Sequence, residues 1–163
     1  MDKRTTFIGH RYLWGSDKDI RNRLSEEVKK QIEQGCKFFT MGVHGEFAKL
    51  ALSVCRELRK TYKDIEIEVV ITSFNQVNPI INYDPIFGTD KYYLYNDVKT
   101  IMYDIEEEHY KRKITVSNRQ MIDTCQTLIC YVDTTRTHGG AILAYKYAKK
   151  KGLQIVNLYQ EKI

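Results

Sequence analysis

The chain has 163 residues, with 26 basic and 21 acidic side chains, a formal net charge of +5 and a pI near 8.9. A chain of this length fits one domain and buries roughly 70% of the surface that it would expose unfolded. Its charge is below that of a typical dedicated nucleic-acid binder, and it has no apolar stretch typical of a signal peptide or a membrane span. We therefore expect a soluble, cytoplasmic protein that does not contact a membrane.

The first half of the chain alternates short apolar runs with helical patterns. The runs are rich in β-branched and aromatic residues, which is typical of strands, and between them apolar side chains recur every three or four residues. In chain order the sequence predicts a strand at 5–8, a helix that begins at Ser16 or Asp17 and is closed by Gly35, a strand at 36–41, a helix at 46–58 and a strand at 65–71.

The second half opens with residues 72–95, which have no clear period and are interpreted as a long loop with a helical turn near Lys91. After it we expect a strand at 98–105, a charged connector from Glu106, a helix at 118–125, a strand at 127–132, a helix at 140–151 and a strand at 154–158. Strands that alternate with helices build parallel sheets covered by helices. The sequence predicts an α/β fold with an open, mainly parallel sheet of about five strands and helices on both faces.

Four cysteines are present, and none belongs to a C-x-x-C pair. Zinc sites and disulfide frameworks show regular cysteine and histidine spacings that this chain lacks. We expect reduced core residues, no metal and no cofactor. Because neither Cys55 nor Ser73 lies in a nucleophile-elbow pattern, covalent hydrolase chemistry is not expected. The cysteines are Cys36, Cys55, Cys125 and Cys130.

Three loops that carry glycine and histidine follow predicted strands. Open parallel sheets bind ligands at the carboxyl ends of their strands, where glycine lets the backbone approach a ligand and the next helix offers free N–H groups. We expect the loops to share one rim and to bind an anion, although a simple turn also explains the first loop. They are Gly9-His10-Arg11, Gly42-Val43-His44-Gly45-Glu46-Phe47 and Thr137-His138-Gly139-Gly140.

The three rim histidines, His10, His44 and His138, are candidates for acid–base groups, metal ligands or neutral hydrogen-bond donors. No spacing places them on one helical face, which argues against a metal site. The chain also lacks the G-x-G-x-x-G and P-loop patterns, so an ordinary dehydrogenase or P-loop NTPase is not expected.

Residues 117–123 (SNRQMID) form a further candidate binding segment. Ser117 or Asn118 is expected to cap the predicted helix, with Met121 and Ile122 packed inward. Arg119 and Asp123 then lie at i and i+4 on one face, either as a surface ion pair or with Arg119 in the site. In the second case Arg119 joins Arg11 as a paired phosphate contact.

Taken together, the three loops, the SNRQMID segment and the closing THGGAILAYKYAKKKG stretch resemble the SLOG superfamily. This group includes the YpsA-like proteins, the LOG phosphoribohydrolases and the ligand-sensing domains of some anti-phage proteins. The resemblance implies a single Rossmann-like domain over residues 1–163, with a variable insertion around 72–113. It also implies a site for nucleotide-derived molecules and a dimer or tetramer.

The family's binding positions can be carried onto this chain residue by residue. The matching positions are Gly9, His10, Arg11, Gly42, Gly45, Glu46, Phe47, Asn118, Arg119, Gly139 and Gly140, and His44, Asp123, Thr137, His138 and Ala141 complete the candidate site as neighbours in the same segments.

Two acids of the family are missing. Ala48 stands in place of the aspartate of G-x-F-D, and Lys146 in place of the glutamate of P-G-G-x-G-T-x-x-E. Cleavage of an N-glycosidic bond needs a carboxylate, and Glu46 is the substitute that the sequence offers. We therefore expect a protein that senses or sequesters an ADP-ribose-like molecule or a nucleoside phosphate. A nucleoside-monophosphate N-glycosidase is the alternative, followed by a nucleic-acid-binding protein.

Overall fold

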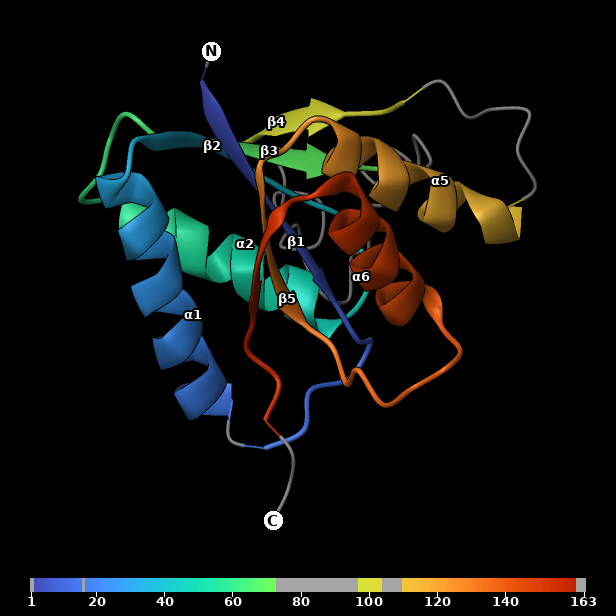
Figure 1. Cartoon of the computed structure of the whole chain (residues 1–163). Coiled ribbons are helices and arrows are strands. Elements are labelled where there is room, and N and C mark those ends of the chain that lie inside the picture. Colours follow the sequence, from blue (N-terminus) through green and yellow to red (C-terminus); the bar gives the residue numbers. More distant parts are fainter. Residues whose placement is uncertain (1, 16, 73–96, 104–109, 161–163) are drawn as a thin grey trace, which may run out of the picture.

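The computed structural model describes residues 2–15, 17–72, 97–103 and 110–160. Their strands form one sheet in the order β4-β3-β2-β1-β5-β6, and every neighbouring pair is parallel (Figure 1). The predicted α/β fold is confirmed, with six strands rather than about five, because the short β4 pairs with β3. The strands are β1 (Lys3–Gly9), β2 (Cys36–Met41), β3 (Glu66–Val70), β4 (Lys99–Ile101), β5 (Thr127–Tyr131) and β6 (Gln154–Asn157).

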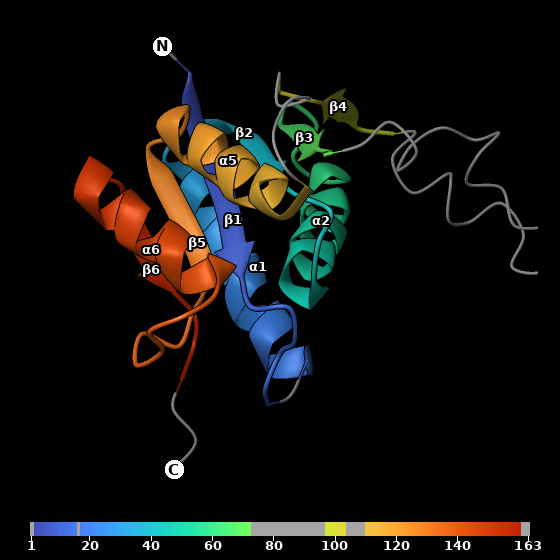
Figure 2. The same ribbon diagram turned by 90° about the vertical axis from the view of Figure 1, so that its right-hand side faces the viewer.

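Helices cover both faces of the sheet, as Figures 1 and 2 show. Side chains of a strand alternate between the two faces, so the neighbours Phe7 and Ile8 of β1 enter different cores. Phe7 packs in the core that contains Leu24 and Leu52, and Ile8 packs with Ile122 and Ile142. The first core lies under α1 (Asp17–Glu33) and α2 (Glu46–Arg59), and the second under α5 (Tyr110–Asp123) and α6 (Gly140–Lys151).

The helix predicted at 118–125 is longer at its start and shorter at its end, since α5 runs from Tyr110 to Asp123. Ser117 and Asn118 therefore lie inside the helix, and the prediction that one of them caps it is wrong. Burial of Met121 and Ile122 in the second core stabilises the helix and overrides the weak helix propensity of the β-branched residues 114–116. The inward packing of these two side chains is confirmed.

Several predictions fall outside the described residues. They concern Ser16 as the candidate helix start, Ser73, the helical turn near Lys91, the end of the strand predicted at 98–105, and the connector from Glu106.

All four cysteines are free and buried, which confirms that they are core residues. Burial raises the pKa of Cys125 to about 11 and that of Cys130 to about 12, and it also raises the pKa of Cys55. These thiols stay protonated at neutral pH and are poor nucleophiles.

Among the described residues no three His, Cys, Asp or Glu side chains are grouped as a metal site would require. Within the same part of the chain, no helix combines the length and the apolar character needed to cross a membrane.

Candidate functional site

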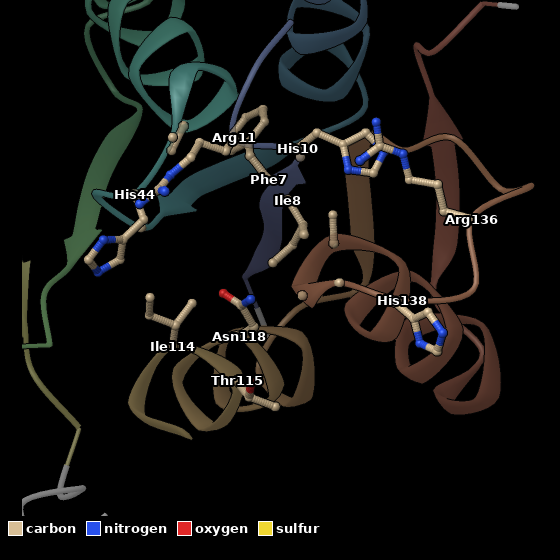
Figure 3. A pocket seen from close by; sticks show the side chains of 17 residues that line it. Phe7, Ile8, His10, Arg11, His44, Ile114, Thr115, Asn118, Arg136 and His138 are labelled. Atoms are coloured by element: carbon tan, nitrogen blue, oxygen red, sulfur yellow. The ribbon is translucent and has the colours of Figure 1, made fainter. Parts of the chain in front are cut away.

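A cavity of about 470 Å³ lies at the carboxyl end of β1 (Figure 3). The three loops singled out in the sequence all contribute to its wall, and one side of α5 closes it. This is the shared rim that the alternation of strands and helices predicts. The lining residues are Phe7, Ile8, Gly9, His10, Arg11, Gly42, His44, Gly45, Ala48, Ile114, Thr115, Asn118, Arg136, His138, Gly139, Gly140 and Ala141.

Most of the predicted site residues line this cavity, and their part in binding stays a prediction. Five candidates are absent from the lining, namely Glu46, Phe47, Arg119, Asp123 and Thr137. The contacts that Glu46, Phe47, Arg119 and Asp123 make with other parts of the chain explain why they do not line the cavity.

The start of α2 is tightly joined to the loop after β1. Gly45 precedes the helix with φ 89° and no side-chain cap, and a Cβ at this position would lie 3.1 Å from Arg11 Cα. The Glu46 backbone N–H donates to the Arg11 carbonyl oxygen at 2.8 Å. A residue other than glycine at position 45 would push these two loops apart.

Phe47 belongs to the core and not to the ligand-facing surface. Its side chain is fully buried, and its ring stacks on that of Tyr131 with centroids 6.1 Å apart. A Cβ added at Gly9 would lie 2.5 Å from the Phe47 side chain. The structure therefore explains Gly9 through packing, and Phe47 is not among the residues that line the cavity.

Glu46 is the candidate acid–base group, yet its carboxylate is engaged outside the cavity. Glu46 Oε2 accepts a hydrogen bond of 2.7 Å from the backbone N–H of Leu13. The bond fixes the chain that leaves β1, and Glu46 is not among the residues that line the cavity. The geometry thus gives Glu46 a structural task.

The start of α6 has open space around it. Gly139 precedes the helix with φ 117° and no side-chain cap, and a Cβ at Gly139 or Gly140 would meet no atom within 4 Å. The first N–H groups of a helix have no partner within it, and they carry the positive end of the helix dipole. At α6 these groups adjoin the cavity wall formed by Gly139, Gly140 and Ala141.

Two of the cavity histidines are held in neutral form. His44 Nε2 lies 3.3 Å from Thr72 Oγ1, and burial, followed by the charge of Arg11, lowers the pKa of His44. His10 Nε2 accepts a hydrogen bond of 2.8 Å from the Asp133 backbone N–H. His10 and His44 therefore add no positive charge to the cavity at neutral pH, whereas the lining residues Arg11 and Arg136 do.

Arg119 and Asp123 pack on α6 rather than in the cavity. The Arg119 guanidinium carbon lies 5.2 Å from the ring centroid of Tyr147, and Asp123 Oδ1 accepts from the Tyr147 hydroxyl at 2.7 Å. Successive residues of a helix are about 100° apart around its axis, so Asn118 lines the cavity while Arg119 turns away. This placement corrects the predicted pairing of Arg119 with Arg11.

Arg136 is the cavity arginine that the sequence did not reveal. It lies in the loop before α6, with its guanidinium carbon 4.4 Å from the Trp14 ring centroid, and Figure 3 shows it extending toward His10. No periodic pattern marks a side chain in such a loop. Ile114, by contrast, lies four residues before Asn118, and the longer helix would have placed both on one side of α5.

Comparison with known proteins shows the fold and not the activity. No family model matches the chain, and no curated protein matches it. It is similar in structure to TM1055, a Northeast Structural Genomics Consortium target determined by X-ray crystallography. The likeness covers 94% of this chain and 72% of that one, with a TM-score of 0.55 and 10% sequence identity. At that identity, the similarity supports the α/β architecture alone.

Proposed function

We propose that the cavity binds a phosphorylated, nucleotide-derived molecule, of the ADP-ribose type or a nucleoside phosphate, and that the protein senses or sequesters it. One observation carries this proposal. Two helix starts without side-chain caps, those of α2 and α6, adjoin one cavity whose described lining contains arginines and no carboxylate. Helix N-termini and arginines favour anions, and phosphate is the common anion that matches both.

Arg11 supports a phosphate position beside α2. Its carbonyl oxygen accepts a hydrogen bond from the Glu46 N–H at the start of this helix. In the same cavity the pKa of His44 is lowered by burial and then by the charge of the Arg11 guanidinium. An anion placed here would meet a permanent cation together with a helix dipole.

The rest of the cavity suits a base or a sugar. A volume of about 470 Å³ lies within the usual range of small-molecule sites. Ile8, Ala48 and Ile114 offer apolar surface. In Figure 3 the Asn118 amide points into the cavity, where it can both donate and accept.

Binding is favoured over N-glycosidic cleavage because no Asp or Glu is among the described residues that line the cavity. Glu46 holds the Leu13 N–H, and Lys146 occupies the position of the family's glutamate on the exposed side of α6. Without a carboxylate at the ligand, water activation and support of an oxocarbenium-like transition state have no group to supply them.

A retention experiment tests the proposal. The protein is incubated with AMP, ADP, ADP-ribose or cyclic ADP-ribose, freed of unbound ligand and heated, and the supernatant is analysed by chromatography. Release of an intact ligand supports sensing or sequestration. Release of a free base indicates the glycosidase instead, and retention of none of the four contradicts the proposal.

Two arginine variants locate the site. Arg11→Ala removes charged hydrogen bonds to phosphate, so we expect affinity for the retained ligand to fall at least about tenfold, since such bonds contribute about 1.5–3 kcal/mol. Arg119→Ala is the matched control, because this arginine stacks on Tyr147 outside the cavity, and its affinity should match wild type. A loss in the Arg119 variant alone would show that the phosphate lies beside α5 and not beside α2.

Self-association into a dimer or tetramer is a separate expectation from the SLOG resemblance. Light scattering of the free protein and of the protein with retained ligand measures it directly, and a monomer in both states would contradict it.

A further inference from the structure

His10 connects the end of β1 to the loop of residues 133–139, which leads into α6. The Asp133 backbone N–H donates to His10 Nε2 at 2.8 Å, and the His10 backbone N–H donates to the Tyr131 carbonyl oxygen at 3.1 Å. A ring nitrogen that accepts a hydrogen bond carries no proton. The Asp133 bond therefore requires a neutral imidazole with its hydrogen on Nδ1.

The imidazole is enclosed and has little freedom to find another partner. His10 is 7% exposed. Three aromatic rings meet it nearly at right angles, those of Trp14, Tyr131 and Tyr159, with centroid separations of 5.5, 6.4 and 6.4 Å. Rotation of the imidazole to a new acceptor or donor would disturb this whole aromatic cluster.

The charged groups around His10 are Arg136 and Asp133. Asp133 is occupied on both oxygens, since Oδ1 accepts from Thr135 Oγ1 at 2.6 Å and Oδ2 from the Tyr159 hydroxyl at 3.3 Å. Arg136 stacks on Trp14. The loop is thus held by the hydrogen-bonded Asp133 carboxylate, by Arg136 stacked on Trp14, and by His10 Nε2. Of these three groups, His10 alone changes its charge near neutral pH.

The loop that His10 holds carries much of the cavity wall. Arg136, His138 and Gly139 all belong to it and line the cavity. Asn157 fixes Val132, the residue before the loop, through two hydrogen bonds. The Val132 N–H donates to Asn157 Oδ1 at 3.1 Å, and Asn157 Nδ2 donates to the Val132 carbonyl oxygen at 2.8 Å. The residue before the loop is therefore held by β6, and the first residue of the loop is held by His10.

We propose that His10 is a positioning residue: in its neutral form it holds residues 133–139 at the cavity, and on taking a proton it releases them, so that the cavity binds its ligand only while His10 is neutral. Protonation places a hydrogen on Nε2, which then opposes the Asp133 N–H. The consequence for binding rests on the proposed function, whereas the hold on the loop does not.

The direction of the pH effect follows from the surroundings of His10. Burial lowers its pKa, the charge of Arg136 lowers it further, and Asp133 opposes the shift. The unfolded chain takes up this proton at about pH 6.5, and the folded chain resists it. The stability that neutral His10 gives the loop is therefore complete above about pH 6.5, and it is lost as the pH falls through the lower pKa that His10 has in the folded chain.

Amide hydrogen exchange at Asp133, expressed as a protection factor, tests the hold without any ligand. Gln in place of His10 offers a carbonyl oxygen near the position of Nε2 that accepts the Asp133 N–H and takes no proton in this range. Phe keeps a ring and offers no acceptor. We expect wild-type protection to fall at least tenfold between pH 7.5 and pH 5, His10→Gln to stay protected at both, and His10→Phe to be unprotected at both.

Three results would overturn the proposal. Nitrogen-15 spectra that place the imidazole hydrogen on Nε2 at pH 7.5 would do so. So would wild-type protection that stays constant while the same spectra show His10 taking a proton, or a folded His10→Phe protein that protects Asp133 like wild type. If the Phe variant does not fold, the spectra and the comparison of wild type with His10→Gln still decide.

The effect on binding is measured by ADP-ribose retention against pH. Wild type should lose affinity in acid, and His10→Gln should lose this pH dependence even though it still contains His44 and His138. An equal pH dependence in both proteins would overturn the binding part of the proposal. Failure of every protein to retain ADP-ribose at any pH counts against the proposed function, and the exchange experiment then judges the role of His10 by itself.

Discussion

The starts of α2 and α6 look alike in sequence and differ in their surroundings. Each helix follows a glycine with positive φ, 89° at Gly45 and 117° at Gly139, and neither has a side-chain cap. A Cβ at Gly45 would press on the Arg11 backbone, whereas one at Gly139 would meet nothing within 4 Å. The first start is packed against the Arg11 backbone on one side and lines the cavity on the other, whereas the second has open space around both of its glycines.

This difference teaches that a glycine-rich loop after a strand has two separable uses. At Gly9 the missing Cβ makes room for the Phe47 side chain of α2, and at Gly45 it makes room for the Arg11 backbone. At Gly139 and Gly140 it leaves the backbone accessible, which is what close approach by a ligand requires. Substitutions at the two places should therefore affect different measurements.

The largest expected effect is on stability, at Gly9. Ala there would place a methyl group 2.5 Å from the buried Phe47 side chain, so we expect the free energy of unfolding to fall by about 3 kcal/mol. Gly140→Ala is the matched control, because space is open around it, and its unfolding energy should change by less than about 0.5 kcal/mol. Urea denaturation measures both, and equal losses would refute the distinction between the two helix starts.

Gly140→Ala, which should hardly change stability, is expected to weaken ligand binding at the start of α6. Gly140→Ala adds a methyl group where the proposed phosphate approaches the helix N–H groups, so the affinity for the retained nucleotide should fall about tenfold, or about 1.4 kcal/mol. Isothermal titration calorimetry gives the value. Unchanged affinity together with unchanged stability would mean that the open helix start is not a phosphate position.

A smaller effect is expected at Glu46. Its carboxylate accepts the Leu13 N–H, and the Gln carbonyl oxygen in Glu46→Gln still accepts this bond without the charge, so we expect a loss of about 1 kcal/mol in unfolding free energy. Ligand retention should be unchanged. If this variant abolished the release of a free base from a nucleoside monophosphate, Glu46 would be catalytic and the binding-only proposal would fail.

The smallest expected change is spectroscopic. Trp14 is the single tryptophan, and the Arg136 guanidinium that stacks on it also lines the cavity. An anion bound near α6 would draw Arg136 from the indole, so ADP-ribose should shift the Trp14 emission of wild type. Arg136→Ala should emit alike with and without ADP-ribose. A wild-type emission unaffected by a ligand that calorimetry detects would place that ligand on the α2 side.

The sequence predicted the helices and strands well where an apolar pattern is flanked by glycines. The strand predicted at 36–41 and the helix predicted at 140–151 match β2 and α6. Both elements have an apolar pattern, and glycines lie directly before and after each of them. The start of α5 was missed, since Ser117-Asn118 resembles a cap and residues 114–116 favour a strand. Tertiary packing decided between these tendencies.

The sequence could predict which loops form the site, but it could not predict where their side chains point. The strand order brings the three loops to one rim, so Gly42, His138 and their neighbours could be placed from topology alone. Arg119 and Arg136 could not be distinguished in this way. The direction of Arg119 depends on where its helix begins, and Arg136 is directed by Trp14, which lies far from it in sequence.

The contact between Gly9 and Phe47 also bears on how this site can change during evolution. At Gly9 and Gly45 the wall beside α2 has no room for a larger side chain, because the Phe47 side chain and the Arg11 backbone already lie against these glycines. New ligand preferences would have to arise through residues 133–139 and the cavity-facing side of α5, where substitutions do not disturb the core. Libraries meant to redirect specificity should be concentrated in these two segments, with the β1 and α2 loops kept constant as the frame.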